Sequence, residues 1–449
     1  MTKIVTLLHS LAPYLKATSL RRMVHVITAM LTMSGRVTML GISRWTEKGG
    51  SYRTIQRFYN RALPWALLHW ALFKAELYEP DDVYILVGDE CVVPKAGHHT
   101  HGLDRFFSSL YGKPIPGLAF FALSVVNTRE RRSYPLQVEQ MLGAECGKAA
   151  APQPEPQQQP PAQGKRPVGR PKGSKNKDKT QVTLTPELQL IQNMVRKQQV
   201  IFNGGLSPAY LVLDGHFGHH NALQMVRQCG LDMISKLRCD SALYFVYDGP
   251  QKKRGARRKY GDKLDYDHIP ERYLQASEIE DGIRTDYYQA TMLSKSFAQP
   301  LNVVIIVKTK LKTGARAHVI LFSSDLTLAY EKVVDYYRLR FQIEFNFRDA
   351  KQYWGLDDFM NVKEIPVTNA ANLALFMVNV AQRLLADFRQ HHPHAGVLDL
   401  KAFFRGHKYV SATLELLPEK PDPILIEHIY DQITALGSIH PANRAHASP

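Results

Sequence analysis

The stretch Asp335-Tyr-Tyr-Arg-Leu-Arg-Phe-Gln-Ile-Glu-Phe-Asn-Phe-Arg-Asp-Ala-Lys351 has the pattern of one long amphipathic helix. Its polar members recur at steps of three or four and therefore share one helix face: Tyr337, Arg340, Glu344, Arg348 and Lys351. One interpretation is a solvated face, with Glu344–Arg348 pairing worth roughly a few tenths of a kcal/mol. The phenylalanines around these positions leave little face for solvent. They favour the other interpretation, a face that handles phosphates.

The composition indicates a globular protein that binds a polyanion. The chain has 449 residues with 45% hydrophobic content, enough for two or three domains. Its formal net charge of +16 points to nucleic acid, although a basic surface can also serve solubility alone. The four cysteines have no CxxC spacing, which indicates reduced thiols. The N-terminus lacks a signal-peptide pattern, and no apolar run approaches the ~18 residues of a membrane span, so we predict a cytoplasmic, nucleoid-associated protein.

Residues 1–78 have a helical pattern and are predicted to form a DNA-binding domain. Ser51 follows a Gly-Gly turn and is a suitable N-cap for the next helix. Arg53 and Arg57 lie on one side of that helix, as in the recognition helix of a helix-turn-helix. An ordinary helical bundle is the alternative.

Two predicted strands of a central sheet end at acidic residues. Residues 83–88 form a continuous apolar run that ends at Asp89, and residues 209–213 form another that ends at Asp214. Strands at 118–126 and 133–140 would extend the first into an antiparallel meander. An acid at a strand end is often only a cap or turn residue. Two such acids together with Glu344 instead suggest oxygen ligands for Mg²⁺ or Mn²⁺, with two ions serving phosphoryl transfer.

The segment 147–181 is predicted to be a linker, because its Pro/Gln-rich part cannot form a core. Its basic part centres on Gly169-Arg170-Pro171 and resembles an AT-hook that enters the minor groove of A·T tracts, with DNA contacts from Arg166, Arg170 and Lys172. A generic basic arm is the alternative.

Residues 239–327 are predicted to form a β-rich insertion. A hairpin tip there carries a basic run suited to phosphate contacts and including Lys252, Lys253 and Arg254; a solvated loop is the alternative. A helix at 370–389 would pack on the sheet, and the Pro- and His-rich tail beyond Pro418 is expected to be loosely held.

The spacing Tyr337-x2-Arg340-x3-Glu344-x6-Lys351 resembles the Y-R-E-K signature of bacterial cut-and-paste insertion-sequence transposases of the DDE class. The order strand-Asp, strand-Asp, β-rich insertion, helix-Glu is similar to their RNase H-like catalytic domain. The resemblance implies an α/β fold with an RNase H-like mixed sheet flanked by helices. Its catalytic domain would comprise residues 79–146, 182–238 and 328–392, followed by a C-terminal region at 393–449.

The same resemblance implies the roles of the site residues. Asp89, Asp214 and Glu344 would hold the metal ions. Arg340 and Lys351 would grip DNA phosphates with Tyr337, and Arg348 could join them although it lies outside the signature. The implied activity is cutting of element ends and joining of the 3′-OH to target DNA by a homodimer. An RNase H-like nuclease without strand transfer, or a domesticated DNA-binding protein, are the alternatives. For the histidines at 98, 99 and 101 and at 216, 219 and 220, zinc binding is one interpretation, but loop positions near a DNA groove or a role in proton transfer are favoured.

Overall fold

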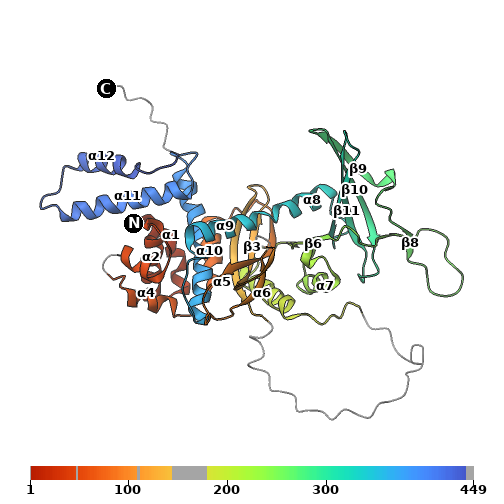
Figure 1. Ribbon diagram of the computed structural model, residues 1–449, viewed down its shortest axis with the longest axis horizontal. Helices are drawn as coiled ribbons and strands as arrows, with labels where there is room; N and C mark the ends of the chain where they lie inside the picture. The colour runs from red at the N-terminus through yellow and green to blue at the C-terminus, as the bar shows by residue number, and fades with distance from the viewer. Residues whose placement is uncertain (1, 47–48, 109–111, 144–178, 441–449) are drawn as a thin grey trace, which may run out of the picture. The chain divides into compact units, whose positions relative to one another are not determined.

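The computed structural model describes residues 2–46, 49–108, 112–143 and 179–440. The chain divides into two compact units (Figure 1). The first contains Met1–Gln140, Met194–Ala209 and Arg338–Pro449, and the second contains Met141–Asn193 and Tyr210–Tyr337. The fold is mixed α/β, as predicted, and is consistent with an RNase H-like fold. The AT-hook-like segment with Arg166, Arg170 and Lys172 lies outside the described residues.

Helices open the first unit, in agreement with the predicted pattern. They are α1 (Thr2–Leu8), the 3-10 turn η1 (His9–Tyr14), α2 (Ala17–Thr32), α3 (Met39–Trp45), α4 (Tyr52–Tyr59) and α5 (Trp65–Glu76). Helices α2, α3 and α4 contact one another. The Ser51 hydroxyl accepts a hydrogen bond from Thr54 N at 3.4 Å, so the predicted N-cap of α4 is confirmed.

The sheet of the first unit is antiparallel. Its strands are β1 (Tyr84–Pro94), β2 (Asp104–Ser108), β3 (Lys113–Asn127) and β4 (Arg132–Met141). Strand β3 pairs with all three others, because its length gives it room for both β1 and β2. The sequence predicted the β1–β3–β4 meander but missed β2, which lacks a buried apolar run: its five residues alternate between exposed and half-buried.

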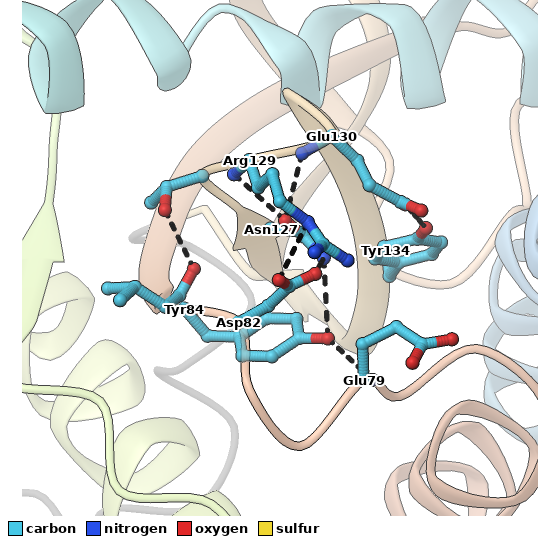
Figure 2. Close-up of polar contacts among 9 residues, drawn as sticks. Glu79, Asp82, Tyr84, Asn127, Arg129, Glu130 and Tyr134 are labelled. Carbon is cyan, nitrogen blue, oxygen red and sulfur yellow. Dashed lines mark hydrogen bonds and ion pairs between the residues drawn. The ribbon is translucent and has the colours of Figure 1, made fainter.

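The β3–β4 hairpin is held by a polar network (Figure 2). The Asp82 carboxylate accepts hydrogen bonds from Asn127 Nδ2 at 2.6 Å and from Arg129 Nε at 2.8 Å. The Asn127 side-chain oxygen in turn accepts the backbone N–H groups of Arg129 and Glu130. Tyr134 donates its hydroxyl to Glu130 at 2.7 Å. These contacts satisfy the turn's backbone donors and fix where β4 begins.

Two helices cover this sheet: α9 (Gln342–Trp354) and α10 (Glu364–Phe388). Helix α10 sends amide side chains to backbone carbonyls of β4. Asn372 Nδ2 donates to Val138 O at 3.0 Å, Asn379 Nδ2 to Pro135 O at 2.8 Å and Gln382 Nε2 to Ser133 O at 3.2 Å. An open strand edge would leave these carbonyls without partners, so α10 closes the sheet at β4.

The predicted single helix over 335–351 is wrong. The chain forms α8 (Tyr330–Leu339) and then α9, with Arg340 and Phe341 between them. At the break the hydrogen bonds shorten to three residues: Phe341 N donates to Arg338 O, and Ile343 N to Arg340 O, both at 3.1 Å. This tightening changes the rotation per residue, so spacing before the break no longer aligns with spacing after it.

The strands of the second unit lie in the order β5-β6-β12-β11-β10-β7-β8, and β9 also pairs with β10. The strands are β5 (Tyr210–Val212), β6 (Asp232–Leu237), β7 (Tyr244–Val246), β8 (Tyr260–Lys263), β9 (Leu274–Glu280), β10 (Ile283–Leu293), β11 (Leu301–Lys310) and β12 (Arg316–Ser323). Strands β5 and β6 are parallel. The pairs β6–β12, β12–β11 and β11–β10 are antiparallel. Helix α6 (Pro186–Phe202) precedes β5, and η3 (Gly215–Phe217) and α7 (His220–Gln228) connect β5 to β6. The turn η4 (Glu271–Tyr273) precedes β9.

The C-terminal region is better ordered than expected. Helices α11 (Val397–Leu416) and α12 (Pro423–Thr434) contact each other, and α11 contacts α2. The buried Asp399 carboxylate accepts the backbone N–H groups of Ile439 and His440 at 2.5 and 3.1 Å. The expectation of a loosely held tail beyond Pro418 is therefore wrong as far as residue 440. The Pro- and His-rich composition of the tail could not show that the Asp399 carboxylate, 40 residues earlier, accepts its backbone N–H groups.

Candidate active site

Asp89 lies within strand β1 rather than at its end. The strand continues to Pro94, and Asp89 pairs in register with Ala122 of β3. The predicted strand end at Asp89 is therefore wrong, because the apolar pattern resumes at Cys91 after two polar residues. The side chain of Asp89 is 17% exposed. A carboxylate this sheltered needs a compensating cation or hydrogen-bond donors.

Arg340 supplies that cation and connects Asp89 to Glu344. Its Nη1 forms an ion pair with Asp89 Oδ2, and its Nη2 lies 3.5 Å from Glu344 Oε1. The guanidinium side chain is only 14% exposed. Glu344 stands in the first turn of α9, where the helix dipole favours a carboxylate. The structure thus brings together three of the predicted site residues: the carboxylates of Asp89 and Glu344 both contact the guanidinium of Arg340.

Lys351 fastens the other end of α9 to the same strand. Its Nζ donates to Val92 O at 2.8 Å and lies 4.0 Å from Asp357 Oδ1. Helix α9 is therefore attached to β1 through Arg340 near its start and through Lys351 in its last turn. The Cys91 thiol beside this contact is buried, and burial raises its pKa to about 11. It is consequently a protonated, unreactive thiol at neutral pH.

Arg348 differs from these residues because it points to solvent. Its guanidinium pairs with the neighbouring Asp349 at 2.9 Å and lies 4.8 Å from the Phe345 ring. Exposed pairs of this kind contribute little to stability. The arrangement leaves the Arg348 side chain at the surface.

Asp214 and Tyr337 belong to the second unit. Asp214 follows β5, as predicted, and its Oδ1 accepts a hydrogen bond from His216 N at 3.1 Å. It therefore caps the turn η3, which is the cap role that any acid at a strand end can take. Tyr337 lies on α8, separated from Arg340 by the break in the helix. We predicted that Tyr337 shares one continuous helix face with Glu344 and Lys351. Because Tyr337 lies on α8 and the other two lie on α9, helical spacing does not place them on one face.

The donor chemistry of Asp89 and Glu344 fits a divalent cation. Both offer carboxylate oxygens, the ligand type that Mg²⁺ and Mn²⁺ prefer, and both already face one cationic group. Within the described ranges, no group of three or more His, Cys, Asp or Glu side chains is arranged to hold a metal ion. The zinc alternative for the histidines accordingly finds no support there. His216 instead faces Glu187 at 3.6 Å, and His220 Nε2 lies 2.6 Å from Lys179 O.

Several predicted DNA-contact residues are exposed on regular elements. Arg53 and Arg57 project from α4, whose opposite face buries Ile55 and Phe58. Lys252, Lys253 and Arg254 are exposed in the loop between the antiparallel strands β7 and β8, so the predicted hairpin tip is confirmed.

The base of this hairpin loop is closed by specific contacts. Gln251 and Arg258 exchange two hydrogen bonds of 2.8 Å, and the Arg258 guanidinium lies 4.4 Å from the Tyr247 ring. The cations therefore stand on a structured loop.

Sequence reasoning missed Lys95 and Asp357, which support the loop after α9. Lys95 Nζ donates to Asp357 O at 3.2 Å and to Phe359 O at 2.9 Å, and it lies 3.6 Å from the Phe359 ring centre. Burial lowers the pKa of Lys95 to about 8 and raises that of Asp357. Both line a cavity of about 720 Å³ with Arg36 and Met360. A sequence does not reveal which backbone carbonyls a lysine contacts, so Lys95 could not be identified from it. The adjacent acids Asp357 and Asp358 were the one feature of this loop that the sequence showed.

A family model described as DDE superfamily endonuclease matches residues 10–298. The chain belongs to the DDE superfamily endonuclease family. No curated protein matches this chain. Membership supports a nuclease or transposase type of activity on DNA, and this family generally uses divalent metal ions.

The DDE match has a boundary that bears on the site. It includes Asp89 and Asp214 and ends before Arg340, Glu344 and Lys351. The family assignment is consequently independent of the Y-R-E-K spacing. In the parts of this DDE endonuclease that the structure describes, no helix is long and apolar enough to cross a bilayer.

Proposed function

We propose that this DDE endonuclease is a transposase of the insertion-sequence type, which cuts element ends and joins the resulting 3′-OH to target DNA. Water would attack a phosphodiester at the element end, and the released 3′-OH would then attack a target phosphodiester in line. The observation that supports this proposal most directly is the pair of acids, Asp89 and Glu344, held on one guanidinium in the first unit.

The proposed metal ligands are Asp89, Glu344 and, from the second unit, Asp214. Mg²⁺ or Mn²⁺, in two ions, would activate the attacking oxygen and stabilise charge on the leaving oxygen. The residues of the chain orient the ligands. Arg340 holds the two first-unit carboxylates near each other before a metal ion binds, and Lys351 fixes α9 along β1 through Val92 O.

DNA binding would be divided among several basic elements. Arg53 and Arg57 on α4 would enter a groove, while Lys252, Lys253 and Arg254 would contact phosphates. Tyr337, Arg340, Arg348 and Lys351 would contact the backbone near the cleaved end. Arg166, Arg170 and Lys172 would add minor-groove contacts. The net charge of +16 supports this assignment of DNA as the partner. A cytoplasmic homodimer holding two element ends completes the proposal.

The decisive experiment separates cutting from joining. Purified full-length protein is given labelled element-end DNA with Mn²⁺, and Asp89→Asn, Asp214→Asn and Glu344→Gln are compared with wild type. Each variant should lose cleavage while keeping end binding in a gel-shift assay. A pre-cut end with a 3′-OH then tests joining to a target plasmid.

The outcomes discriminate the alternatives. Joined products confirm a transposase, whereas cleavage without joining indicates an RNase H-like nuclease. Binding with neither reaction in wild type would leave a domesticated DNA-binding protein. If one variant keeps wild-type cleavage, the role of that acid is refuted.

For the basic segment, Arg170→Ala with Lys172→Ala should weaken binding most on A·T-rich DNA. An equal loss on all sequences would indicate a generic basic arm.

A further inference from the structure

The contacts of Arg340 use the same oxygens that a metal ion would need. Asp89 Oδ2 and Glu344 Oε1 both face the guanidinium, one at Nη1 and one at Nη2. The Arg340 and Asp89 side chains are largely sheltered from solvent, while Glu344 is partly open. The charges of Arg340 and Asp89 are therefore weakly screened, so the Asp89 carboxylate in particular responds strongly to any change of its neighbouring cation.

Charge balance shows why the two cations compete. Two ionised carboxylates carry a charge of about −2, of which one guanidinium neutralises half. A divalent ion on the same oxygens would neutralise them fully and would then repel the adjacent guanidinium. Arg340 and the dication therefore cannot both keep their best contacts with Asp89 and Glu344.

The position of Arg340 allows it to move. It lies in the two-residue break between α8 and α9 and not within either helix. Its long side chain can also rotate away without displacing Glu344, whose backbone belongs to α9. Because a guanidinium has a planar fork that holds two carboxylates at once, lysine could not reproduce this bridge as well.

We propose that Arg340 is an internal competitor for the divalent cation: it holds Asp89 and Glu344 together until the metal binds and is then released towards DNA phosphates. This inference rests on the proposed metal-binding role of these two acids. It assigns Arg340 two successive partners, carboxylates first and phosphate second. Metal binding would thereby make a DNA-contacting cation available beside the reacting phosphate.

The test measures metal affinity without DNA and without activity. Mn²⁺ is titrated calorimetrically into full-length wild type, Arg340→Gln, Arg340→Lys and Asp89→Asn. Arg338→Gln is the matched control, because Arg338 is exposed and lies two residues away. Arg340→Gln should bind Mn²⁺ about tenfold more tightly, in line with the smallest coupling measured for close charge pairs. Arg340→Lys should fall between wild type and Arg340→Gln, and the control should match wild type.

Thermal unfolding with and without Mn²⁺ gives a second readout that tolerates a destabilised variant. Arg340→Gln should melt lower than wild type without metal and should gain more from Mn²⁺. Equal or weaker Mn²⁺ affinity in Arg340→Gln, or an equal gain in Arg338→Gln, would overturn the competition. Unchanged affinity in Asp89→Asn would instead overturn the metal assignment itself and the competition with it. Lower affinity in Asp89→Asn keeps the assignment, whatever Arg340→Gln does.

Discussion

His69 provides a sharp test of how the first unit is packed. Its side chain is fully buried on α5, and its Nδ1 lies 3.0 Å from Pro135 O on β4. The ring stands 5.3 Å from that of Phe376 on α10. The buried Nε2 atom has no hydrogen-bond partner among the described residues. A neutral ring that donates from Nδ1 suits this environment, whereas a protonated ring would bury an N–H without an acceptor.

The size of the effect follows from the pKa. Burial lowers the pKa of His69 from 6.5 to about 4, although the nearby backbone groups of Pro135 and Asn372 pull it upward. Between these two values the unfolded chain binds a proton that the folded protein excludes. The contribution of neutral His69 to the free energy of unfolding is therefore fully present above pH 6.5 and is lost as the pH falls towards 4. At 1.36 kcal/mol per pKa unit the total loss is about 3 kcal/mol.

The assay is urea unfolding followed by tryptophan fluorescence at pH values from 7.5 to 4. We compare wild type with His69→Phe, in which Pro135 O keeps a hydrogen bond from Asn379 at 2.8 Å. His268→Gln is the control, because that histidine is exposed and pairs with the exposed Asp265. Wild type and the control should lose about 3 kcal/mol more than His69→Phe over this pH range. The same pH dependence in all three proteins would refute the role of His69.

Three further variants test other parts of the first unit. Gly355→Ala should lower stability by about 2–4 kcal/mol in thermal unfolding, because Gly355 has φ +80 and a Cβ would lie 2.4 Å from Val37 Cβ; an unchanged melting temperature would contradict this. Burial raises the pKa of Asp399, but hydrogen bonds from Gly396, His440 and Ile439 together lower it to about 2. The ionised Asp399 carboxylate contributes about 2 kcal/mol to the free energy of unfolding, fully above pH 3.8 and progressively less as the pH falls towards 2. Because Asp399→Asn removes this carboxylate, it should speed amide exchange at residues 439–440 even at neutral pH. Asp82→Asn should cost about 1–3 kcal/mol by urea unfolding, because an amide cannot accept from both of its present donors as a carboxylate does.

Much of the fold could be predicted because apolar periodicity reports burial directly. The runs that became β1, β3 and β11 are buried along most of their length, and so are the residues on the inner face of α10. Short or exposed elements gave no such signal. Strands β2 and β8 have no fully buried residue, and each is placed by antiparallel pairing with a strand adjacent in the sequence, β3 and β7 respectively.

The candidate site was predictable in residue type but not in geometry. Asp89 was identified as the acid that follows an apolar run, and Arg340 and Glu344 were identified from helical spacing; the structure brings the three together. Spacing could not show that the helix breaks at Arg340, because a break of this kind depends on local hydrogen bonds rather than on polarity. Nor could it show that Lys351 binds a carbonyl of β1, since a backbone acceptor is the same at every residue.

Helix α10 links the proposed DNA-binding helix to the candidate site. Its buried Asn369 donates hydrogen bonds of 2.7 Å to Tyr59 O and to Arg61 O, at the end of α4. The Asn369 side-chain oxygen also accepts Trp65 Nε1 at 2.7 Å. The same α10 packs against α9, which carries Glu344. Helix α4 therefore cannot shift without disturbing buried hydrogen bonds to α10, which cost about 1–3 kcal/mol each when a partner is lost. If α4 binds DNA as proposed, that DNA would for this reason keep a fixed distance from Asp89 and Glu344, and recognition by the first helices would then determine which phosphate reaches the acids.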